Sequence, residues 1–258
     1  MSDGWQRVGP RARHALAYWG GLGLLTWDVA RNAWLPRRYL AHVVAEFDGM
    51  GVRSLVVAGT AALFTGMVFA LQSAVYLSRF GADLYVGPLV GLSVLRELGP
   101  VLTAILVGGK VASGITAELG SMKVTEQIDA LRAIGVNHVK RLIVPRVWAA
   151  LLVFPLLTVL ADFIALVGGM LIAVYERRID VYLYWNTIFY WVVISDLVTG
   201  VGKSFFFGVI VTLIGAHNGL AMTGGTEGLG RATTATVVQV SLAVIIADFF
   251  LTKLFLLL

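Results

Sequence analysis

Six ionisable residues interrupt long apolar runs in this chain, and their chemistry needs an explanation. They are Arg96, Glu97, Asp162, Asp196, Lys203 and Asp248. A charge at the centre of a membrane-spanning helix costs about 2.5–3.5 kcal/mol, so such groups usually pair or face protein or water. Glu97, Lys203 and Asp248 fall near the centres of three separate apolar runs. We expect Lys203 to lie between the two carboxylates, either as a network that only fixes helix register or as a functional site.

Residues 121–134 form a second segment of interest, bounded by Gly120 and Gly135. Its apolar residues recur at helical spacing: Val124, Ile128, Leu131 and Ile134. Its other positions carry charges of both signs: Lys123, Glu126, Asp129 and Arg132. This pattern predicts an amphipathic helix of about 20 Å, too short and too charged to span a membrane. It could lie in the membrane interface, but anionic lipid favours a basic face, so mixed charge favours a groove in another protein.

The scaffold that positions these residues is expected to be an all-α integral membrane protein. Of the 258 residues, 58% are hydrophobic and 14% are charged, whereas soluble domains are about 45–50% apolar and about 25% charged. There is no cysteine, which excludes disulfides and thiolate sites. The four histidines show no metal-ligand spacing. Gly202-Lys203-Ser204 matches only the end of a phosphate-binding loop, since Leu197 replaces its first glycine. We therefore expect no metal, no enzyme activity and no nucleic-acid partner.

Five apolar blocks predict five transmembrane helices. They are residues 55–78, 88–114, 146–174, a span within 186–216, and 235–258. Gly99-Pro100 should bend or weaken the second span. Residues 175–185 are predicted to be an outer loop with an aromatic belt, and the glycine-rich residues 217–233 an inner loop.

The N-terminal region, residues 1–51, is predicted to hold cytoplasmic and interfacial helices. Residues 15–34 are broken by glycines and polar residues but carry Trp19, Trp27 and Trp34, and tryptophan favours the membrane–water interface. A sixth span is the alternative for this segment. Pro36-Arg37-Arg38 should break the segment, and residues 39–51 should form a short polar helix. Residues 52–258 then form the five-span domain, including the helix at 121–134.

The distribution of basic residues predicts the orientation. Most of the 20 lie on segments assigned to the inside, whereas the outer loops hold Arg79, Arg177 and Arg178. By the positive-inside rule the N-terminus is cytoplasmic, and five spans place the C-terminus outside.

One face of the first span carries Phe69, Gln72, Ser73, Tyr76 and Phe80, which follow helical spacing. This face either packs on a neighbouring helix or forms a wall of a lipid cavity.

Two stretches resemble a known family. LRELGPVLTAILVGGKVASGITAELGSMKVTEQIDAL, residues 95–131, resembles the signature of MlaE-type permeases. These are membrane subunits of ABC transporters that work with MCE-domain proteins in lipid trafficking. GLGRATTATVVQVSLAVIIADFFLT, residues 228–252, is similar to the C-terminal pattern of the family. The resemblance covers about residues 40–258.

The resemblance implies a permease domain of five spans preceded by interfacial helices, acting as a homodimer in a Gram-negative inner membrane. Two cytoplasmic ATPase subunits would bind ATP and Mg, so this chain would bind no cofactor. A small STAS-domain protein and a periplasmic ring of MCE-domain proteins are further implied partners. The implied substrate is phospholipid, moved between the inner and outer membranes to maintain lipid asymmetry.

The resemblance also implies three sets of site residues. The coupling helix that docks on the ATPase would use Glu118, Met122, Thr125, Glu126, Ile128, Asp129 and Leu131. Charged positions of the family match Arg96, Glu97, Lys203, Arg231 and Asp248. The lipid-cavity wall would include Phe69, Tyr76, Leu77 and Phe80, with Gln72 on the same helix face.

The sequence therefore predicts the permease subunit of an ABC-type phospholipid transporter. An ion-coupled secondary transporter that uses Glu97, Asp162 and Asp248 is the alternative, although the inverted repeats typical of that class are not found. A membrane scaffold without a transport role is a third interpretation.

Overall fold

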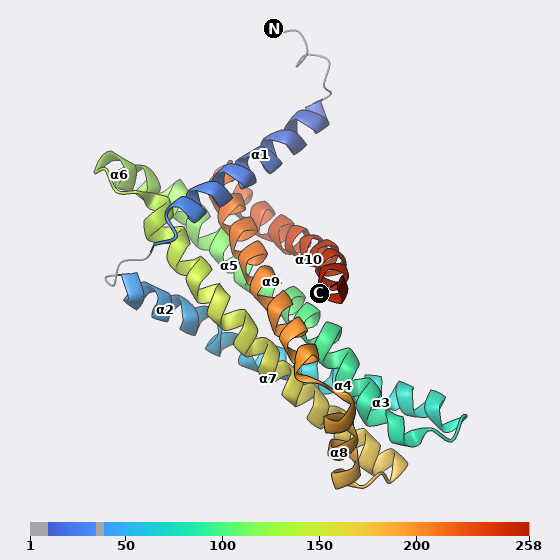
Figure 1. Ribbon diagram of the computed structural model, residues 1–258. Coiled ribbons are helices and arrows are strands. Elements are labelled where there is room, and N and C mark those ends of the chain that lie inside the picture. The colour runs from blue at the N-terminus through green and yellow to red at the C-terminus, as the bar shows by residue number, and fades with distance from the viewer. Residues whose placement is uncertain (1–9, 35–38, 258) are drawn as a thin grey trace.

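The computed structural model describes residues 10–34 and 39–257, and every regular element in these ranges is helical (Figure 1). The α-helices are α1 (Pro10–Arg31), α2 (Leu40–Met50), α3 (Leu55–Ser78), α4 (Val86–Ser93), α5 (Gly99–Val124), α6 (Gln127–Ala133), α7 (Val144–Arg177), α8 (Val181–Trp191), α9 (Ile194–Ala221) and α10 (Gly225–Leu257). Two π-helical turns, Val94–Leu98 and Val139–Ile143, precede α5 and α7. The predicted break at Pro36-Arg37-Arg38 lies outside the described residues.

Five helical stretches are long and apolar enough to cross a membrane. They are Leu40–Ser78, Asp83–Val124, Val139–Arg177, Ile194–Ala221 and Gly225–Leu257. The prediction of five spans in an all-helical chain is confirmed at this level. Helix α1 is not one of the five, and its place in the membrane interface stays a prediction.

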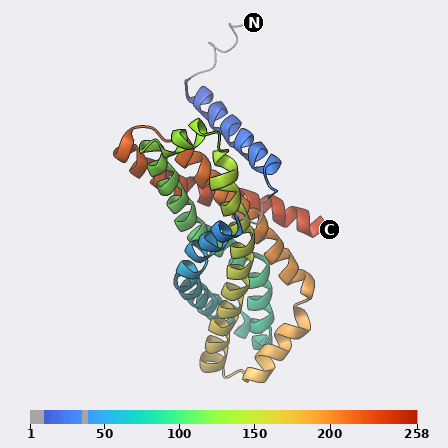
Figure 2. The ribbon, with the colours of Figure 1, turned by 90° about the vertical axis from the view of Figure 1, so that its left-hand side faces the viewer.

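Helix α1 is attached to the bundle by side-chain contacts near both of its ends. The Tyr18 hydroxyl donates to Gln239 Oε1 at 3.0 Å, and the Tyr18 ring meets the His217 ring edge-on. Trp148 Nε1 donates to the carbonyl of Ala33, just beyond the helix, at 2.9 Å. Figures 1 and 2 show α6 and α8 at opposite ends of the bundle, with α1 near the α6 end.

Three predicted boundaries are wrong, and each error has a local cause. The predicted separate helix over residues 121–134 is not found, because α5 continues through Gly120 to Val124. The chain then breaks at Glu126, which is left-handed with φ 59°, and α6 is only seven residues long. Gly120 does not end a helix because it serves packing: a Cβ there would lie 2.5 Å from Leu229 Cδ1. We call residues 121–134 the coupling segment.

The other two corrections concern predicted loops that are helical. Residues 181–191 form α8, because the Asp180 carboxylate accepts hydrogen bonds from the amides of Tyr182 and Leu183 and caps the helix start. In the glycine-rich residues 217–233, only Met222–Gly224 is non-helical. The turn is made at Gly224 and Gly225, where φ is +92° and +62°, and the later glycines continue α10.

Two apolar cores fill the bundle. The first joins α5, α7 and α9 through buried residues such as Val107, Phe154 and Phe207. The second lies towards α4 and α8 and includes Val90 and Tyr184. Because α7 contributes to both cores, this 34-residue helix connects the two ends of the bundle.

Helices α3 and α7 cross at a contact that only glycine permits. A Cβ on Gly66 would lie 1.9 Å from the Ala165 carbonyl oxygen, and a Cβ on Gly168 would lie 2.3 Å from the Leu63 carbonyl oxygen. Small residues at such crossings let helix backbones approach closely, which is a principal source of helix association in membranes.

Replacing Gly66 by valine should therefore separate α3 from α7. We expect a loss of about 1–3 kcal/mol of stability, the usual cost of overpacking, measured by thermal unfolding in detergent. The matched control is Gly114→Val in α5, where an added Cβ meets nothing within 4 Å. Equal stability of the two variants would contradict the close-crossing argument.

Candidate functional site

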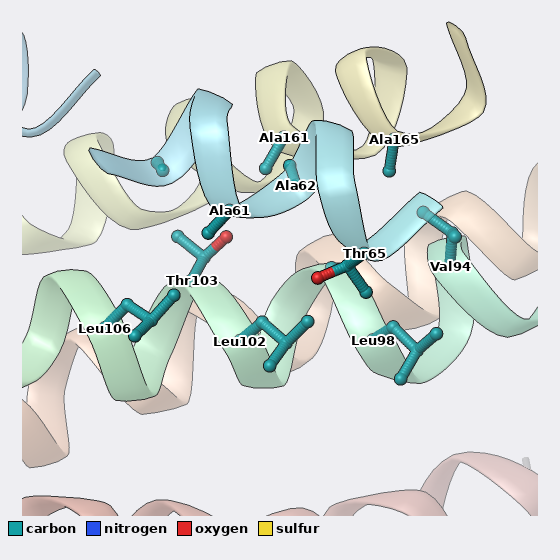
Figure 3. A pocket seen from close by; sticks show the side chains of 12 residues that line it. Ala61, Ala62, Thr65, Val94, Leu98, Leu102, Thr103, Leu106, Ala161 and Ala165 are labelled. Carbon is teal, nitrogen blue, oxygen red and sulfur yellow. The ribbon is translucent and has the colours of Figure 1, made fainter. Parts of the chain in front are cut away.

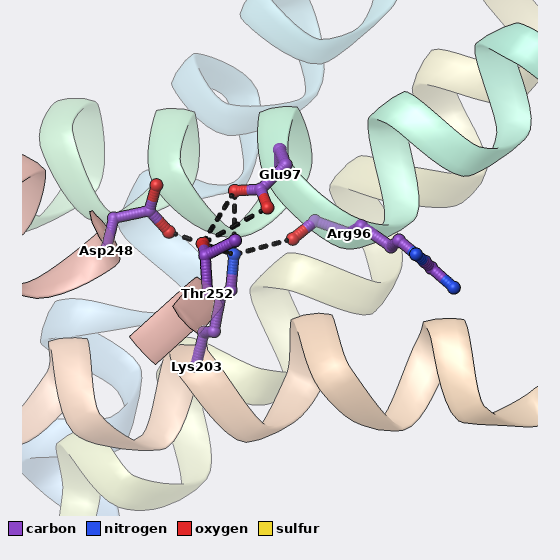
Figure 4. Close-up of polar contacts among 5 residues, drawn as sticks. All are labelled: Arg96, Glu97, Lys203, Asp248 and Thr252. Atoms are coloured by element: carbon purple, nitrogen blue, oxygen red, sulfur yellow. Dashed lines mark hydrogen bonds and ion pairs between the residues drawn. The ribbon is translucent and has the colours of Figure 1, made fainter. Parts of the chain in front are cut away.

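A buried ammonium group holds three helices together near the middle of the bundle (Figure 4). Lys203 of α9 has a side chain with 0% exposure, and its Nζ lies 2.7 Å from Glu97 Oε2 and 3.1 Å from Asp248 Oδ1. It also donates to Thr252 Oγ1 at 2.6 Å. The predicted meeting of Glu97, Lys203 and Asp248 is found, with Thr252 as a member that sequence reasoning missed. We call these four residues the Lys203 cluster.

The π-helical turn before α5 presents Glu97 and a backbone carbonyl to Lys203. The amide of Gly99 donates to the carbonyl of Val94, five residues earlier. Pro100 has no N–H to donate to the carbonyl of Arg96, and that carbonyl accepts from Lys203 Nζ at 3.1 Å. The expected weakness at Gly99-Pro100 therefore appears as a π turn that adds a ligand to the cluster.

The Arg96 side chain belongs to a different pair. Its Nε lies 2.5 Å from Asp196 Oδ1, and Asp196 is 1% exposed. The other carboxylate oxygen of Asp196 accepts from the amide of Val193 at 2.9 Å, at the start of α9. Arg96 and Glu97 are adjacent in sequence but fix two different points on α9.

Arg231 does not reach the cluster, although the sequence grouped it there. It lies 17 positions before Asp248 on α10, about 25 Å along the helix axis. Its guanidinium is exposed and pairs with Glu227 at 3.6 Å.

The coupling segment projects from one end of the bundle (Figure 1). Thr125, Glu126 and Asp129 are exposed there, and Ile134 is 70% exposed. Ile128, however, is 2% exposed and packs within this chain. Exposed groups of this segment can meet a partner, whereas Ile128 holds α6 in place.

Met122 and Leu131 lie on the inner side of this segment and line a groove that also includes His42 and Arg141. Both residues are half-buried, so they too contact their own chain. Next to this groove, burial and the Arg132 guanidinium lower the pKa of the His138 imidazole, which favours its neutral form.

The Glu118 side chain is 59% exposed and also forms an ion pair within its own chain. Its Oε1 lies 2.6 Å from Nη2 of Arg146, and Arg146 Nε lies 2.9 Å from Glu46 Oε1. The Arg146 side chain is 2% exposed, so Glu118 joins α5 to α7 and α2 within the chain. Sequence reasoning missed this network because its three members lie far apart in sequence.

The predicted lipid-cavity wall on α3 lies partly on the surface of the single chain. Tyr76 and Phe80 are 63% and 83% exposed, and Gln72 is exposed as well. Phe69 and Leu77 are half-buried against the second core. Ser73 is buried and Phe80 lies just beyond the end of α3, so the five residues do not form one uniform face. None of the predicted wall residues lines the pocket between α3, α5 and α7 or the groove at Met122 and Leu131.

A cavity that the sequence did not indicate lies between α3, α5 and α7 (Figure 3). It is partly open, and its free volume is about 20 Å³, room for about one water molecule. Its walls are almost entirely apolar, and Leu98, Leu102 and Leu106 form one side along α5. Small alanines on α3 and α7 leave this space open, and no spacing rule in the sequence marks such a void.

No group of three or more histidine, aspartate or glutamate side chains that could hold a metal ion is present within residues 10–34 and 39–257.

Comparison with known proteins gives one consistent family. A family model described as Permease MlaE matches residues 43–254. The intermembrane phospholipid transport system permease protein MlaE of Haemophilus influenzae is 41% identical over 219 residues, 84% of each chain. A probable ABC transporter permease protein of Rickettsia felis is 36% identical over 236 residues, 92% of this chain and 91% of the relative. Protein TRIGALACTOSYLDIACYLGLYCEROL 1, chloroplastic, of Arabidopsis thaliana is 32% identical over 243 residues, 92% of this chain and 68% of that protein.

Replacing Lys203 by methionine should leave the Glu97 and Asp248 carboxylates facing each other without a cation. Removing one partner from a buried ion pair costs about 3–5 kcal/mol, and thermal unfolding in detergent should show a loss of this order. The triple variant K203M/E97Q/D248N should recover part of the loss, because it removes the uncompensated charge. A triple variant no more stable than the single one would contradict this account of the cluster.

Proposed function

The chain belongs to the MlaE permease family of ABC transporter permeases, and from that premise we propose that it moves phospholipid between the inner and outer membranes. As the permease it is a transport subunit and not the catalytic one. ATP would be hydrolysed, with Mg, on a separate partner chain.

The observation that carries the proposal is the geometry of the coupling segment. It projects from the bundle, exposes charges of both signs and includes the last turn of α5. Helix α5 begins at the π turn that supplies Glu97 to the Lys203 cluster. A push on the coupling segment would therefore act on a helix that leads to charged groups in the membrane.

A second copy of this chain is the partner that its exposed apolar faces suit. Over the 33 residues of α10 only Gly228, Thr236, Val240 and Val244 are buried, and Leu242 and Phe249 are 56% and 66% exposed. With Tyr76 on α3 and Phe80 just beyond it also exposed, two copies would enclose a lipid cavity between them. One coupling segment per copy would then serve one ATPase subunit each.

The assembly and its orientation follow from the same proposal. The coupling segment and the N-terminus would face the cytoplasm, and the C-terminus the periplasm, in a Gram-negative inner membrane. A ring of MCE-domain proteins would sit at the periplasmic end, where α8 exposes Tyr182 and Tyr190. A small STAS-domain protein would join on the cytoplasmic side.

One observation favours the ion-coupled alternative. Asp162 of α7 is 2% exposed, and neither of its carboxylate oxygens has a hydrogen-bond partner among the described residues. Such a group could take up a proton or a cation during transport. The two functions differ in one requirement, because an ion-coupled transporter moves its substrate without ATP.

Reconstitution separates the two functions. Tagged protein purified from membranes should carry an ATPase, an MCE-domain protein and bound phospholipid, identified by mass spectrometry. In proteoliposomes, transfer of labelled phospholipid should require ATP. Transfer driven by an ion gradient alone, with no ATPase bound, would replace the proposed function by the alternative.

Docking of the ATPase at the coupling segment can be tested with a single substitution. Ile134→Glu puts a charge on an apolar side chain that is 70% exposed, and should lower recovery of the ATPase about tenfold or more, as loss of a central interface contact does. The control is Leu84→Glu, with similar chemistry at a residue 53% exposed near the opposite end of the bundle. Undiminished ATPase recovery with the Ile134 variant would contradict docking at this segment.

A further inference from the structure

One lysine joins the end of α5 to the end of α9. Lys123, in the last turn of α5, donates from Nζ to the carbonyl oxygen of Leu220 at 2.7 Å and to that of Met222 at 2.8 Å. Leu220 lies in the last turn of α9, and Met222 follows that helix. Lys123 therefore begins in the coupling segment and ends on a different helix.

The contact has the chemistry of a helix cap. The last four carbonyls of a helix have no partner within it, and the end of the helix carries partial negative charge that a cation stabilises. Hydrogen bonds from an ammonium group are about twice as strong as those between neutral groups. Two such bonds from one side chain fix the position of the α9 end relative to the α5 end.

The same place connects α9 to α10. Residues 222–224 are the non-helical connection between these two helices, which we call the α9–α10 link. Close packing accompanies the Lys123 hydrogen bonds, since a Cβ on Gly120 would lie 2.8 Å from Met222 Sδ and 2.5 Å from Leu229 Cδ1. The end of α5 thus contacts both the link and the first turns of α10.

Helix α10 is the element on which such a tie has most effect. Few of its residues are buried; Val240 and Val244 pack in the first core, and polar contacts hold the helix as well. One is the Lys203 cluster, to which α10 contributes Asp248 and Thr252. Another joins Thr236 of α10 to Thr116 of α5 at 3.0 Å. The two hydrogen bonds of Lys123 act near the beginning of this same helix.

A second connection leaves the end of α5 in another direction. Glu118 binds Arg146 of α7, which binds Glu46 of α2. Neither α7 nor α2 contributes a residue to the Lys203 cluster. The contacts of Lys123 therefore lead, as those of Thr116 do, towards the two helices bearing Lys203 and Asp248.

We propose that Lys123 is a positioning residue that passes displacement of the coupling segment to the α9–α10 link, and through it to the Lys203 cluster. The inference rests on the proposed function, because the partner ATPase supplies the displacement. It goes further by naming the side chain and the receiving element.

The first test needs no partner. Hydrogen exchange of the purified chain in lipid nanodiscs should show amides of residues 219–228 exchanging about tenfold or more faster in Lys123→Met, because the variant loses both hydrogen bonds from the charged group and one such bond alone is worth about that factor. Lys123→Arg should exchange as the wild type does. The matched control is Lys140→Met, on the same end of the bundle, for whose side chain no hydrogen bond is found among the described residues. Unchanged exchange in Lys123→Met would overturn the inference.

The second test uses the reconstituted complex with its ATPase. Lys123→Met should keep ATP hydrolysis within about twofold of wild type while phospholipid moved per ATP falls about tenfold, because one link in the transmission is lost. Lys123→Arg should restore the ratio, and Lys140→Met should not change it. An unchanged ratio in Lys123→Met, or equal falls in hydrolysis and transfer, would overturn the inference.

A third readout separates the inference from the proposed function. In the wild-type complex, adding ATP should change exchange at residues 219–228, and in Lys123→Met it should not. A wild-type complex that hydrolyses ATP but moves no phospholipid would overturn the proposed function, and this readout would still decide the role of Lys123. If no ATPase binds the wild-type chain, both proposals fall.

Discussion

The side chain of Lys203 is fully buried, and the arrangement of the inner helices depends on satisfying its ammonium group. Its ligands come from the turn before α5 and from α10, while Lys203 itself stands on α9. An unpaired charge at this depth would be expensive, so the three elements cannot be displaced independently without breaking an ion pair. The cluster thus couples the positions of α5, α9 and α10 to one another.

The other charged groups fix further points on α9. Arg96 with Asp196 fixes the beginning of α9, and Lys123 fixes its end. Lys203 lies between these two points. Helix α9 is therefore held at three places by charged groups, while α10 keeps much of its surface exposed.

Much of this could be predicted from the sequence, and the failures have specific causes. Five apolar blocks predicted five spans, and the cost of membrane charges predicted the meeting of Glu97, Lys203 and Asp248. The glycines misled the boundaries: Gly120 and Gly228 mark close packing inside helices rather than helix ends. Arg231 was grouped with the cluster by resemblance, and helix length alone places it far away. The pairs Glu118–Arg146 and Lys123–Leu220 join distant parts of the chain, which no local pattern reveals.

The π turn at Val94–Leu98 has a consequence for how this chain can tolerate insertion and deletion. A π turn is one extra residue within an α-helix, and each residue of an α-helix rotates the chain by about 100°. The extra residue sets the phase between α4, which packs towards α8, and α5, which packs on α9. Losing one residue there would leave a smoother helix of nearly the same length and hydropathy. It would also turn one half of the second span by more than a quarter turn against the other, so that either Glu97 or the α4 face would no longer meet its partners. Length in this short stretch is therefore constrained in addition to the identities of Arg96 and Glu97.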